Sequence, residues 1–269
     1  MTSGFDFSSG LRPAEARRAF EQRLFSIVYQ PIVHLETGRV LAHEALARSH
    51  SPAFPDILGL LRALEPCGLV GELGRDLRKL AVRGCSHAIA LNVMPLEFAE
   101  GWLVRPDDSM FLHRAPVYLE ITESAPLEYF EQCLDIVDEV RRRGLRIAID
   151  DFGAGYSNLR YISDLRPDLV KLDRKVLAGV KAGNRVHLLL RSIVRLIHEM
   201  GSKVVAEGIE TPEELYVVRK SGADYGQGYL LALPAPQPIT SFDWPVSGDG
   251  SEHGPTARPG PGRNSRRSV

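Results

Sequence analysis

Polar side chains that could bind metal or move protons stand near the carboxyl ends of seven short apolar segments. They are Glu44, Asn92, Glu120, the pair Asp150 and Asp151, Lys171, Glu207 and Gln227. A single acid in such a place is usually a helix cap or an ion-pair partner. Independent caps have no reason to recur at the same depth of successive segments. The set therefore predicts one shared site at the carboxyl ends of several strands.

Five carboxylates in one cleft would repel one another unless cations compensate them. Two divalent ions together with Lys171 would neutralise the five charges. Oxygen ligands without a histidine or cysteine cluster favour Mg²⁺ or Mn²⁺ over Zn²⁺. The sequence HEAL around Glu44 does not indicate zinc, because the next histidine is His50 and the HExxH spacing is absent.

The adjacent aspartates Asp150 and Asp151 are followed by a glycine-rich loop. One of two neighbouring carboxylates can bridge two ions while the other holds one ion, an arrangement used for in-line displacement at phosphorus. The loop contains Gly153 and Gly155 but lacks the third glycine and the downstream acid of a dinucleotide-binding fingerprint. We interpret it as a lid that closes over the metal site.

Eight apolar or β-branched segments are expected to be strands. They read SIVYQPIV, RVLAHEAL, AIALNV, VYLEIT, RIAIDD, DLVKLD, KVVAEGI and YGQGYLL. The first two are joined by HLETG, whose Thr37-Gly38 signals a hairpin, so this pair should be antiparallel. Most of the others alternate with helical patterns, which is typical of a parallel sheet covered on both faces. The sequence predicts an α/β fold, preferably a closed (β/α)8 barrel, with a doubly wound open sheet as the alternative.

Three of the intervening helices carry start or stop signals. Ser124 with Pro126 begins a helix that runs to Gly144. A second helix ends at Gly201. Its apolar stripe consists of Val186, Leu189, Ile193, Ile197 and Met200. The third begins with TPEE at 211–214, a capping box with proline at the first helical position.

The composition is that of an ordinary globular protein, with 269 residues, 44% hydrophobic and 25% charged. The 33 basic and 34 acidic residues give a net charge of -1, which offers no whole-chain argument for binding polymeric nucleic acid or a membrane. The three cysteines lack CxxC spacing, which argues against a disulfide framework or thiolate metal site. Neither a signal peptide nor a membrane-spanning run is recognisable, so we expect a cytoplasmic protein without membrane insertion.

The ends of the chain differ from its middle. Residues 1–23 read as a polar leader and an entry helix, which we expect within Leu11 to Leu24. Residues 24–246 contain all the strand segments and should form the barrel. Residues 247–269 are rich in Gly, Pro, Ser and Arg, and such a composition cannot bury enough apolar surface to order itself. We expect a disordered tail there.

Six segments together resemble the EAL domain, the bacterial phosphodiesterase family that hydrolyses cyclic di-GMP. They are YQPIVHLETGRVLAHEALAR, LEITES, IAIDDFGAGYSNLRYI, DLVKLD, VVAEGIET and GQGYLLALP. The likeness spans about Leu24 to Pro234, and the signature triplet Glu44-Ala45-Leu46 occurs with its companion motifs in order. The resemblance implies a TIM-like (β/α)8 barrel with an antiparallel first strand.

The resemblance also implies a role for each matching residue. The ligands of two Mg²⁺ or Mn²⁺ ions would be Glu44, Asn92, Glu120, Asp150, Asp151 and Glu207. Lys171 would orient and polarise the attacking water, with Glu44 and Glu207 beside it as catalytic groups. Gln227 would lie close to that water and the substrate, and Arg48 would contact a substrate phosphate. Glu123 would support the lid that contains Gly153, Gly155 and Ser157, and Glu210 would support the site from behind.

Departures from the family pattern fall outside this ligand set. Ser49-His50-Ser51-Pro52 stands where the family usually has tryptophan and a His-Pro turn, and 53–84 matches poorly. The implied activity is hydrolysis of cyclic di-GMP to linear pGpG by a homodimer, with regulatory input from dimerisation or a separate sensor protein. The alternative is a catalytically weak or inactive EAL-type barrel that serves as a cyclic di-GMP receptor or as a protein-interaction module. A metal-dependent lyase or hydrolase acting on a small acid would explain the carboxylates but not the ordered motifs.

Overall fold

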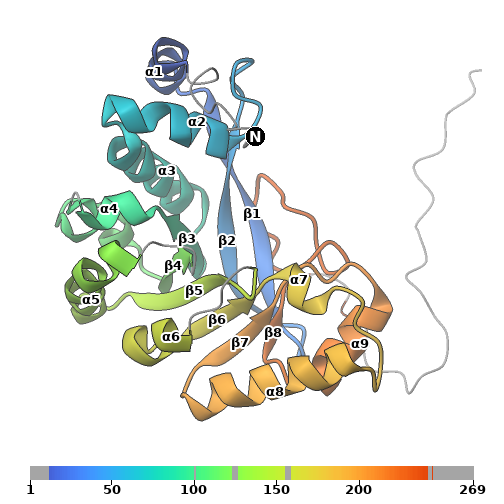
Figure 1. Ribbon diagram of the computed structural model, residues 1–269. Helices are drawn as coiled ribbons and strands as arrows, with labels where there is room; N and C mark the ends of the chain where they lie inside the picture. The colour runs from blue at the N-terminus through green and yellow to red at the C-terminus, as the bar shows by residue number, and fades with distance from the viewer. Residues whose placement is uncertain (1–11, 100, 123–126, 155–158, 242–243, 245–269) are drawn as a thin grey trace, which may run out of the picture.

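Eight strands close into a barrel in the order of the sequence in the computed structural model (Figure 1). The structure describes residues 12–99, 101–122, 127–154, 159–241 and 244. The strands are β1 (Phe25–His34), β2 (Val40–Ser49), β3 (Ile89–Val93), β4 (Val117–Thr122), β5 (Arg146–Phe152), β6 (Leu169–Leu172), β7 (Lys203–Ala206) and β8 (Tyr225–Gly226). β1 pairs antiparallel with both β2 and β8, while β2 to β8 are parallel to one another. The predicted closed barrel with an antiparallel first strand is confirmed.

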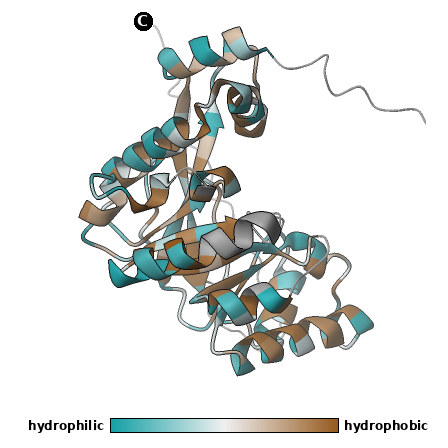
Figure 2. Cartoon of the chain, turned by 60° about the vertical axis from the view of Figure 1, so that its left-hand side comes forward, coloured by the Kyte–Doolittle hydropathy of each residue, from teal (hydrophilic) through white to brown (hydrophobic). Residues whose placement is uncertain are grey.

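Helices cover the outside of the barrel. The α-helices are α1 (Pro13–Glu21), α2 (Ile57–Leu64), α3 (Val70–Gly84), α4 (Pro95–Ala99), α5 (Leu127–Arg142), α6 (Leu159–Leu165), α7 (Arg174–Leu177), α8 (Arg185–Glu199) and α9 (Pro212–Lys220). Short 3-10 turns are η2 (Glu65–Cys67), η3 (Trp102–Val104) and η4 (Ser109–Leu112). Hydrophilic and hydrophobic residues alternate along these helices, as expected for helices with one face on a core (Figure 2). Within the described residues, no helix has the length and apolar content needed to cross a membrane.

The predicted helix boundaries are confirmed only in part. α1 begins at Pro13 and ends at Glu21, inside the expected Leu11 to Leu24. The capping box at the start of α9 is present, since the side chain of Thr211 accepts a hydrogen bond from the backbone of Glu214 and the Glu214 side chain accepts one from the backbone of Thr211. Ser124 and Pro126, expected to begin the helix that is α5, lie outside the described residues.

The predicted stripe on α8 is confirmed at Ile197, which is fully buried, but it is wrong at Leu189. The buried residues are Leu190, Val194 and Ile197, whereas Leu189 is 56% exposed. Val186, Ile193 and Met200 are only partly buried, at the edge of the core. Because three leucines stand in a row at the start of this helix, periodicity alone does not decide which of them faces the barrel. The packing of α8 on β7 decides it.

The last strand is shorter than the predicted segment YGQGYLL. β8 ends at Gly226, and the chain then turns at Gly228, where a side chain would overlap the backbone of Ile209. This close approach is held by hydrogen bonds from Ile209 N to Gln227 O and from Leu230 N to Ile209 O, at 3.1 and 3.0 Å. Gln227 is therefore placed directly beyond the strand, at the rim of the barrel.

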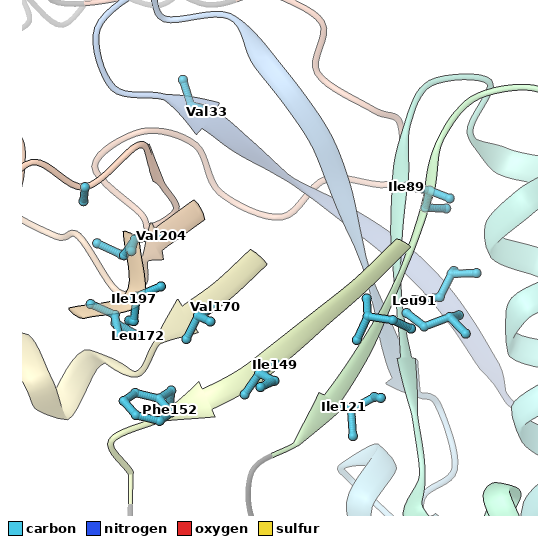
Figure 3. Close-up of a cluster of buried hydrophobic side chains, with 14 of the residues drawn as sticks. Val33, Ile89, Leu91, Ile121, Ile149, Phe152, Val170, Leu172, Ile197 and Val204 are labelled. Atoms are coloured by element: carbon cyan, nitrogen blue, oxygen red, sulfur yellow. The ribbon is translucent and has the colours of Figure 1, made fainter. Parts of the chain in front are cut away.

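Side chains of the strands alternate between two apolar layers. Those that point outward, such as Ile89, Leu91, Ile149 and Val170, pack beneath the helices in the largest core cluster (Figure 3). Those that point inward fill the barrel. This inner cluster contains Ile32, Ala42, Ala90, Tyr118, Ala148, Leu169 and Val205. Alternation with a period of two is what a strand backbone imposes.

The long β1–β2 hairpin carries a smaller lobe, in which α1, α2 and α3 pack near the start of β1 and the end of β2 (Figure 1). The C-terminal segment follows the same hairpin. Ala235 and Tyr29 exchange backbone hydrogen bonds of 2.9 and 2.7 Å, the ring of His43 bonds the carbonyl of Ile239 at 2.9 Å, and Trp244 packs on Gly38. His43 thus ties the C-terminal segment to β2.

We expect this histidine to make stability depend on pH. Burial, aided by neighbouring His87, lowers the pKa of His43 below its ordinary 6.5. In the unfolded chain the ring takes up a proton at higher pH than in the folded chain. The free energy of unfolding should therefore fall as the pH drops below about 6.5. Below the pKa that His43 has in the folded chain, this histidine should cause no further fall.

The measurement is urea unfolding of the wild type and of His43→Gln between about pH 7.5 and 5. Glutamine can still donate to Ile239 O but does not titrate, so the variant should lose less stability on acidification. Equal pH slopes in both proteins would contradict the prediction.

Candidate functional site

The polar layer at the rim follows directly from the alternation along the strands. Six of the predicted site residues stand two positions beyond an inward-facing residue of the inner cluster, one layer closer to the mouth. The pairs are Ala42 and Glu44, Ala90 and Asn92, Tyr118 and Glu120, Ala148 and Asp150, Leu169 and Lys171, and Val205 and Glu207. Because β2 to β8 are parallel, these side chains converge at the carboxyl end of the barrel.

A bulge in β5 allows both adjacent aspartates to face this mouth. Successive side chains of a regular strand point to opposite faces. The β5–β6 register shifts between Ile149 and Phe152, and Asp151 adopts a left-handed backbone with φ 57°. Aspartate tolerates this conformation better than most residues. Asp150 and Asp151 consequently both line the same pocket.

Lys171 lies at the centre of the acidic cluster and is 1% exposed. Its Nζ is 3.3 Å from Glu44 Oε2, 2.8 Å from Glu120 Oε1, 2.9 Å from Asp150 Oδ1 and 2.8 Å from Glu207 Oε1. A single ammonium group facing four carboxylates leaves excess negative charge in the cluster, which a cation could balance.

Side-chain amides orient Glu44 on its other side. Asn92 Nδ2 donates to Glu44 Oε1 at 3.1 Å, and Gln227 Nε2 donates to Glu44 Oε2 at 2.6 Å. Gln227 Nε2 also donates to Gln30 Oε1 at 3.2 Å, while Gln30 Nε2 donates to Ala232 O at 3.0 Å. Since Gln30 accepts from the Gln227 amide nitrogen, it helps direct that nitrogen toward Glu44.

Gln30 was not among the predicted site residues. It lies in the middle of β1, in the segment YQP, and its Cα pairs with that of Glu44 across the hairpin. β1 runs opposite to the other strands, so its rim residue precedes the inner-layer residue Ile32 by two positions. Counting the same number of residues back from the hairpin turn as Glu44 lies beyond it would have identified Gln30 as the residue opposite Glu44.

Burial and charge repulsion shift the acids of the cluster. Burial raises the pKa of Glu207 to about 8, against the attraction of Lys171. Burial and then the charge of Glu44 raise the pKa of Glu120 well above its ordinary value, and burial followed by Asp150 raises that of Asp151. Burial alone would lower the pKa of Lys171, but the surrounding carboxylates raise it well above 10.5. The lysine therefore stays charged, while the acids favour additional positive charge.

The residues fit divalent cations. Two groups of three carboxylates have ligand atoms within 4.8 Å of one another, namely Glu44, Glu120 and Asp150, and Asp150, Asp151 and Glu207. The two groups share Asp150. Oε2 of Glu120 is buried without a hydrogen-bond partner, an arrangement that is costly for a carboxylate unless a cation faces it. The donor set is hard oxygen, which suits Mg²⁺ and Mn²⁺.

A pocket of about 280 Å³ opens beside the acidic cluster. One side of its wall is formed by Arg174, Glu210 and Tyr229, with Tyr229 63% exposed. Arg174 Nη1 is 3.3 Å from Glu210 Oε1. Glu210, expected behind the site, thus lies in the pocket wall as the ion-pair partner of an exposed arginine.

The remaining predicted residues are placed less centrally. Arg48 is exposed, is not among the pocket-lining residues, and donates from Nη1 to the carbonyl of neighbouring Ala47 at 3.0 Å. Gly153 has φ 96°, and a side chain there would overlap Val176 on α7. Glu123, Gly155 and Ser157 lie outside the described residues.

The chain matches a known domain family and several curated proteins. The EAL domain model matches residues 14–234. Among curated relatives, cyclic di-GMP phosphodiesterase NbdA of Pseudomonas aeruginosa is 32% identical over 238 residues, covering 82% of this chain and 30% of the relative. The chain spans 28 to 31% of the length of the first curated relatives it matches.

Solved structures share the barrel. The PaMucR phosphodiesterase in complex with c-di-GMP has a TM-score of 0.73 and 29% identity, covering 83% of this chain and 96% of that one. Klebsiella pneumoniae BlrP1 has been solved with cyclic di-GMP and manganese, and also with calcium. Each has a TM-score of 0.67 and 28% identity, covering 79% of this chain and 56% of that one.

Proposed function

The chain belongs to the EAL domain family, and we propose that it is a two-metal phosphodiesterase that opens cyclic di-GMP to linear pGpG. The observation that carries the proposal is the pair of acidic triads that share Asp150, with Lys171 between the carboxylates. The family relatives named cyclic di-GMP phosphodiesterases and the neighbours solved with that dinucleotide support the substrate. Lowering the concentration of this second messenger would be its physiological effect.

Two divalent cations, when bound, would lower the pKa of a water molecule and stabilise negative charge at phosphorus. The six proposed ligands are Glu44, Asn92, Glu120, Asp150, Asp151 and Glu207. Asp150 is common to both triads, so it would belong to the ligand sets of both cations. Glu44 is fixed by Asn92 and Gln227, so its carboxylate keeps one orientation.

Lys171 and Gln227 are proposed to act on the attacking water. Lys171 stays protonated and faces four carboxylates that are themselves proposed metal ligands. If these carboxylates turned toward the cations, an N–H of the ammonium would become free to donate to a lone pair of the water. Gln227 Oε1 is buried without a hydrogen-bond partner and can accept one. Arg48, four residues beyond Glu44 on β2, is proposed to contact a substrate phosphate after leaving the carbonyl of Ala47.

The direct test is incubation of the purified protein with cyclic di-GMP and Mg²⁺ or Mn²⁺, followed by chromatography of the products. Appearance of pGpG supports the proposal. Tight calorimetric binding of the dinucleotide without product would instead assign the chain to the receptor alternative. A homodimer and a separate sensor protein remain proposals, which analytical ultracentrifugation and co-purification would test.

Metal choice provides a second prediction. Hydrolysis should require Mg²⁺ or Mn²⁺, and Ca²⁺ should inhibit it, because calcium adopts a larger and looser coordination shell. Cyclic di-GMP should still bind with Ca²⁺, as expected from the calcium complex of BlrP1. The measurement is the initial rate with each ion, beside calorimetric affinity. Full activity in excess chelator would rule out the two-metal mechanism.

A further inference from the structure

A buried charge network lies outside the acidic site, among α3, α4 and the turn before η4. Arg78, Glu97 and Asp108 are each at most 2% exposed. Arg78 Nη1 donates to Glu97 Oε1 at 2.5 Å, and its Nε and Nη2 donate to Asp108 Oδ2 at 3.0 and 2.9 Å. One guanidinium group therefore holds two carboxylates in fixed positions.

The second oxygen of each carboxylate holds a different backbone amide. Glu97 Oε2 accepts from Met94 N at 3.0 Å, whereas Asp108 Oδ1 accepts from Met110 N at 3.1 Å. Buried ion pairs are seldom more stabilising than well-packed apolar residues, so stability alone does not account for the network. What it adds is a fixed geometry for two turns of the backbone.

The turn held by Glu97 directly follows the rim residue Asn92. β3 ends at Val93, and Met94 is the next residue. The side chain of Asn92 is exposed and reaches Glu44 through one hydrogen bond of 3.1 Å. Its direction therefore depends strongly on the backbone at the end of β3, which the bond from Met94 N to Glu97 fixes.

We propose that Glu97, held by Arg78, is a positioning residue that aims Asn92 at the metal site. This inference rests on the proposed function, in which the Asn92 amide oxygen is a metal ligand. Groups that orient metal ligands commonly change metal affinity or activity by about 10- to 100-fold when they are removed. Asp108, which shares Arg78 but holds the more distant Met110, should lack this effect.

The test compares Glu97→Gln with Asp108→Asn in the full chain. A glutamine replaces one of the two carboxylate oxygens by an NH2 group, which would then face either Arg78 Nη1 or Met94 N, and both of these are donors. We expect Glu97→Gln to raise the Kd for Mn²⁺, measured by calorimetry without substrate, by about tenfold. Asp108→Asn should lower the Tm to a similar extent but leave that Kd within about twofold, because its effect is structural.

A second variant displaces the Glu97 carboxylate without changing a charge. A methyl group at Gly74 on α3 would overlap the Glu97 carboxylate, while alanine itself favours the helix. Gly74→Ala should therefore also weaken Mn²⁺ binding by about tenfold. It keeps the inference testable if Glu97→Gln does not fold. In both variants, hydrogen exchange at Met94 N should become faster.

Two outcomes would overturn the inference. One is an unchanged Mn²⁺ affinity although exchange at Met94 N is faster. The other is an equal loss of affinity in Asp108→Asn, which would make the network a general support of the fold. A wild type that binds no Mn²⁺ would refute the proposed metal site itself, and this inference with it. Wild-type binding with unaffected variants refutes only the role of Glu97.

Discussion

Lys171→Met is expected to give a barrel whose stability depends on divalent cations. Removing the ammonium leaves Glu44, Glu120, Asp150 and Glu207 facing one another without a buried positive charge. Breaking a buried pair by removing one partner costs about 3–5 kcal/mol. For a chain of this size that corresponds to a fall in Tm of about 10 °C in chelator. Mn²⁺ should restore most of the loss, because the cations replace the missing charge.

Thermal unfolding in chelator and in Mn²⁺ measures this effect. The matched control is Lys203→Met, which removes a 60% exposed lysine from its ion pair with Asp224 and should change the Tm by about 2 °C or less. With Mn²⁺ present to stabilise the fold, Lys171→Met should hydrolyse cyclic di-GMP at least about 10²-fold more slowly than the wild type, because the group proposed to orient the water is gone. The same loss of Tm with and without Mn²⁺ would show that the lysine contributes packing and not charge.

Turnover should be abolished by Glu44→Ala or by Asp150→Ala. Glu44 contacts Asn92, Gln227 and Lys171, and Asp150 belongs to both acidic triads. Metal ions stabilise the charged transition state by several kcal/mol. If loss of one ligand removes about 4 kcal/mol of this stabilisation, the hydrolysis rate falls by about 10³-fold. Both variants should remain folded, because the inner apolar layer lies one step below these residues.

Rates at saturating Mn²⁺, with circular dichroism of each protein, test this expectation. Glu213→Ala on α9 is the matched control, since it removes an exposed glutamate outside the cluster and should leave the rate unchanged. Hydrolysis near the wild-type rate by either site variant would refute the assignment of that residue as a ligand.

The rim carboxylates were predictable because two simple regularities coincide. Parallel strands bring their carboxyl ends to one edge, and alternation decides which side chains face inward. Gln30 escaped this reasoning because β1 runs in the opposite direction and carries its rim residue in mid-strand. The hairpin contained the necessary information, since Gln30 and Glu44 stand equally far on either side of Thr37 and pair with one another.

Other features depend on contacts that no local pattern specifies. Arg78 meets Glu97 and Asp108 across 19 and 30 residues of sequence, and many other acids were equally available. The phase of α8 was ambiguous because its first turn is apolar on several sides. The early end of β8 follows from the approach of Gly228 to Ile209, which is a tertiary contact. The bulge that turns Asp151 toward the pocket is likewise a matter of sheet register.

The inner apolar layer beneath the rim has a consequence for how such a protein diverges. The inner cluster fills the barrel without any help from the rim residues, so substitutions one step above it alter the pocket without opening the core. A descendant could therefore exchange its acids one at a time while every intermediate still folded. Few substitutions would therefore be needed for such a protein to lose catalysis while it keeps a ligand-sized pocket. The result would be a dinucleotide receptor.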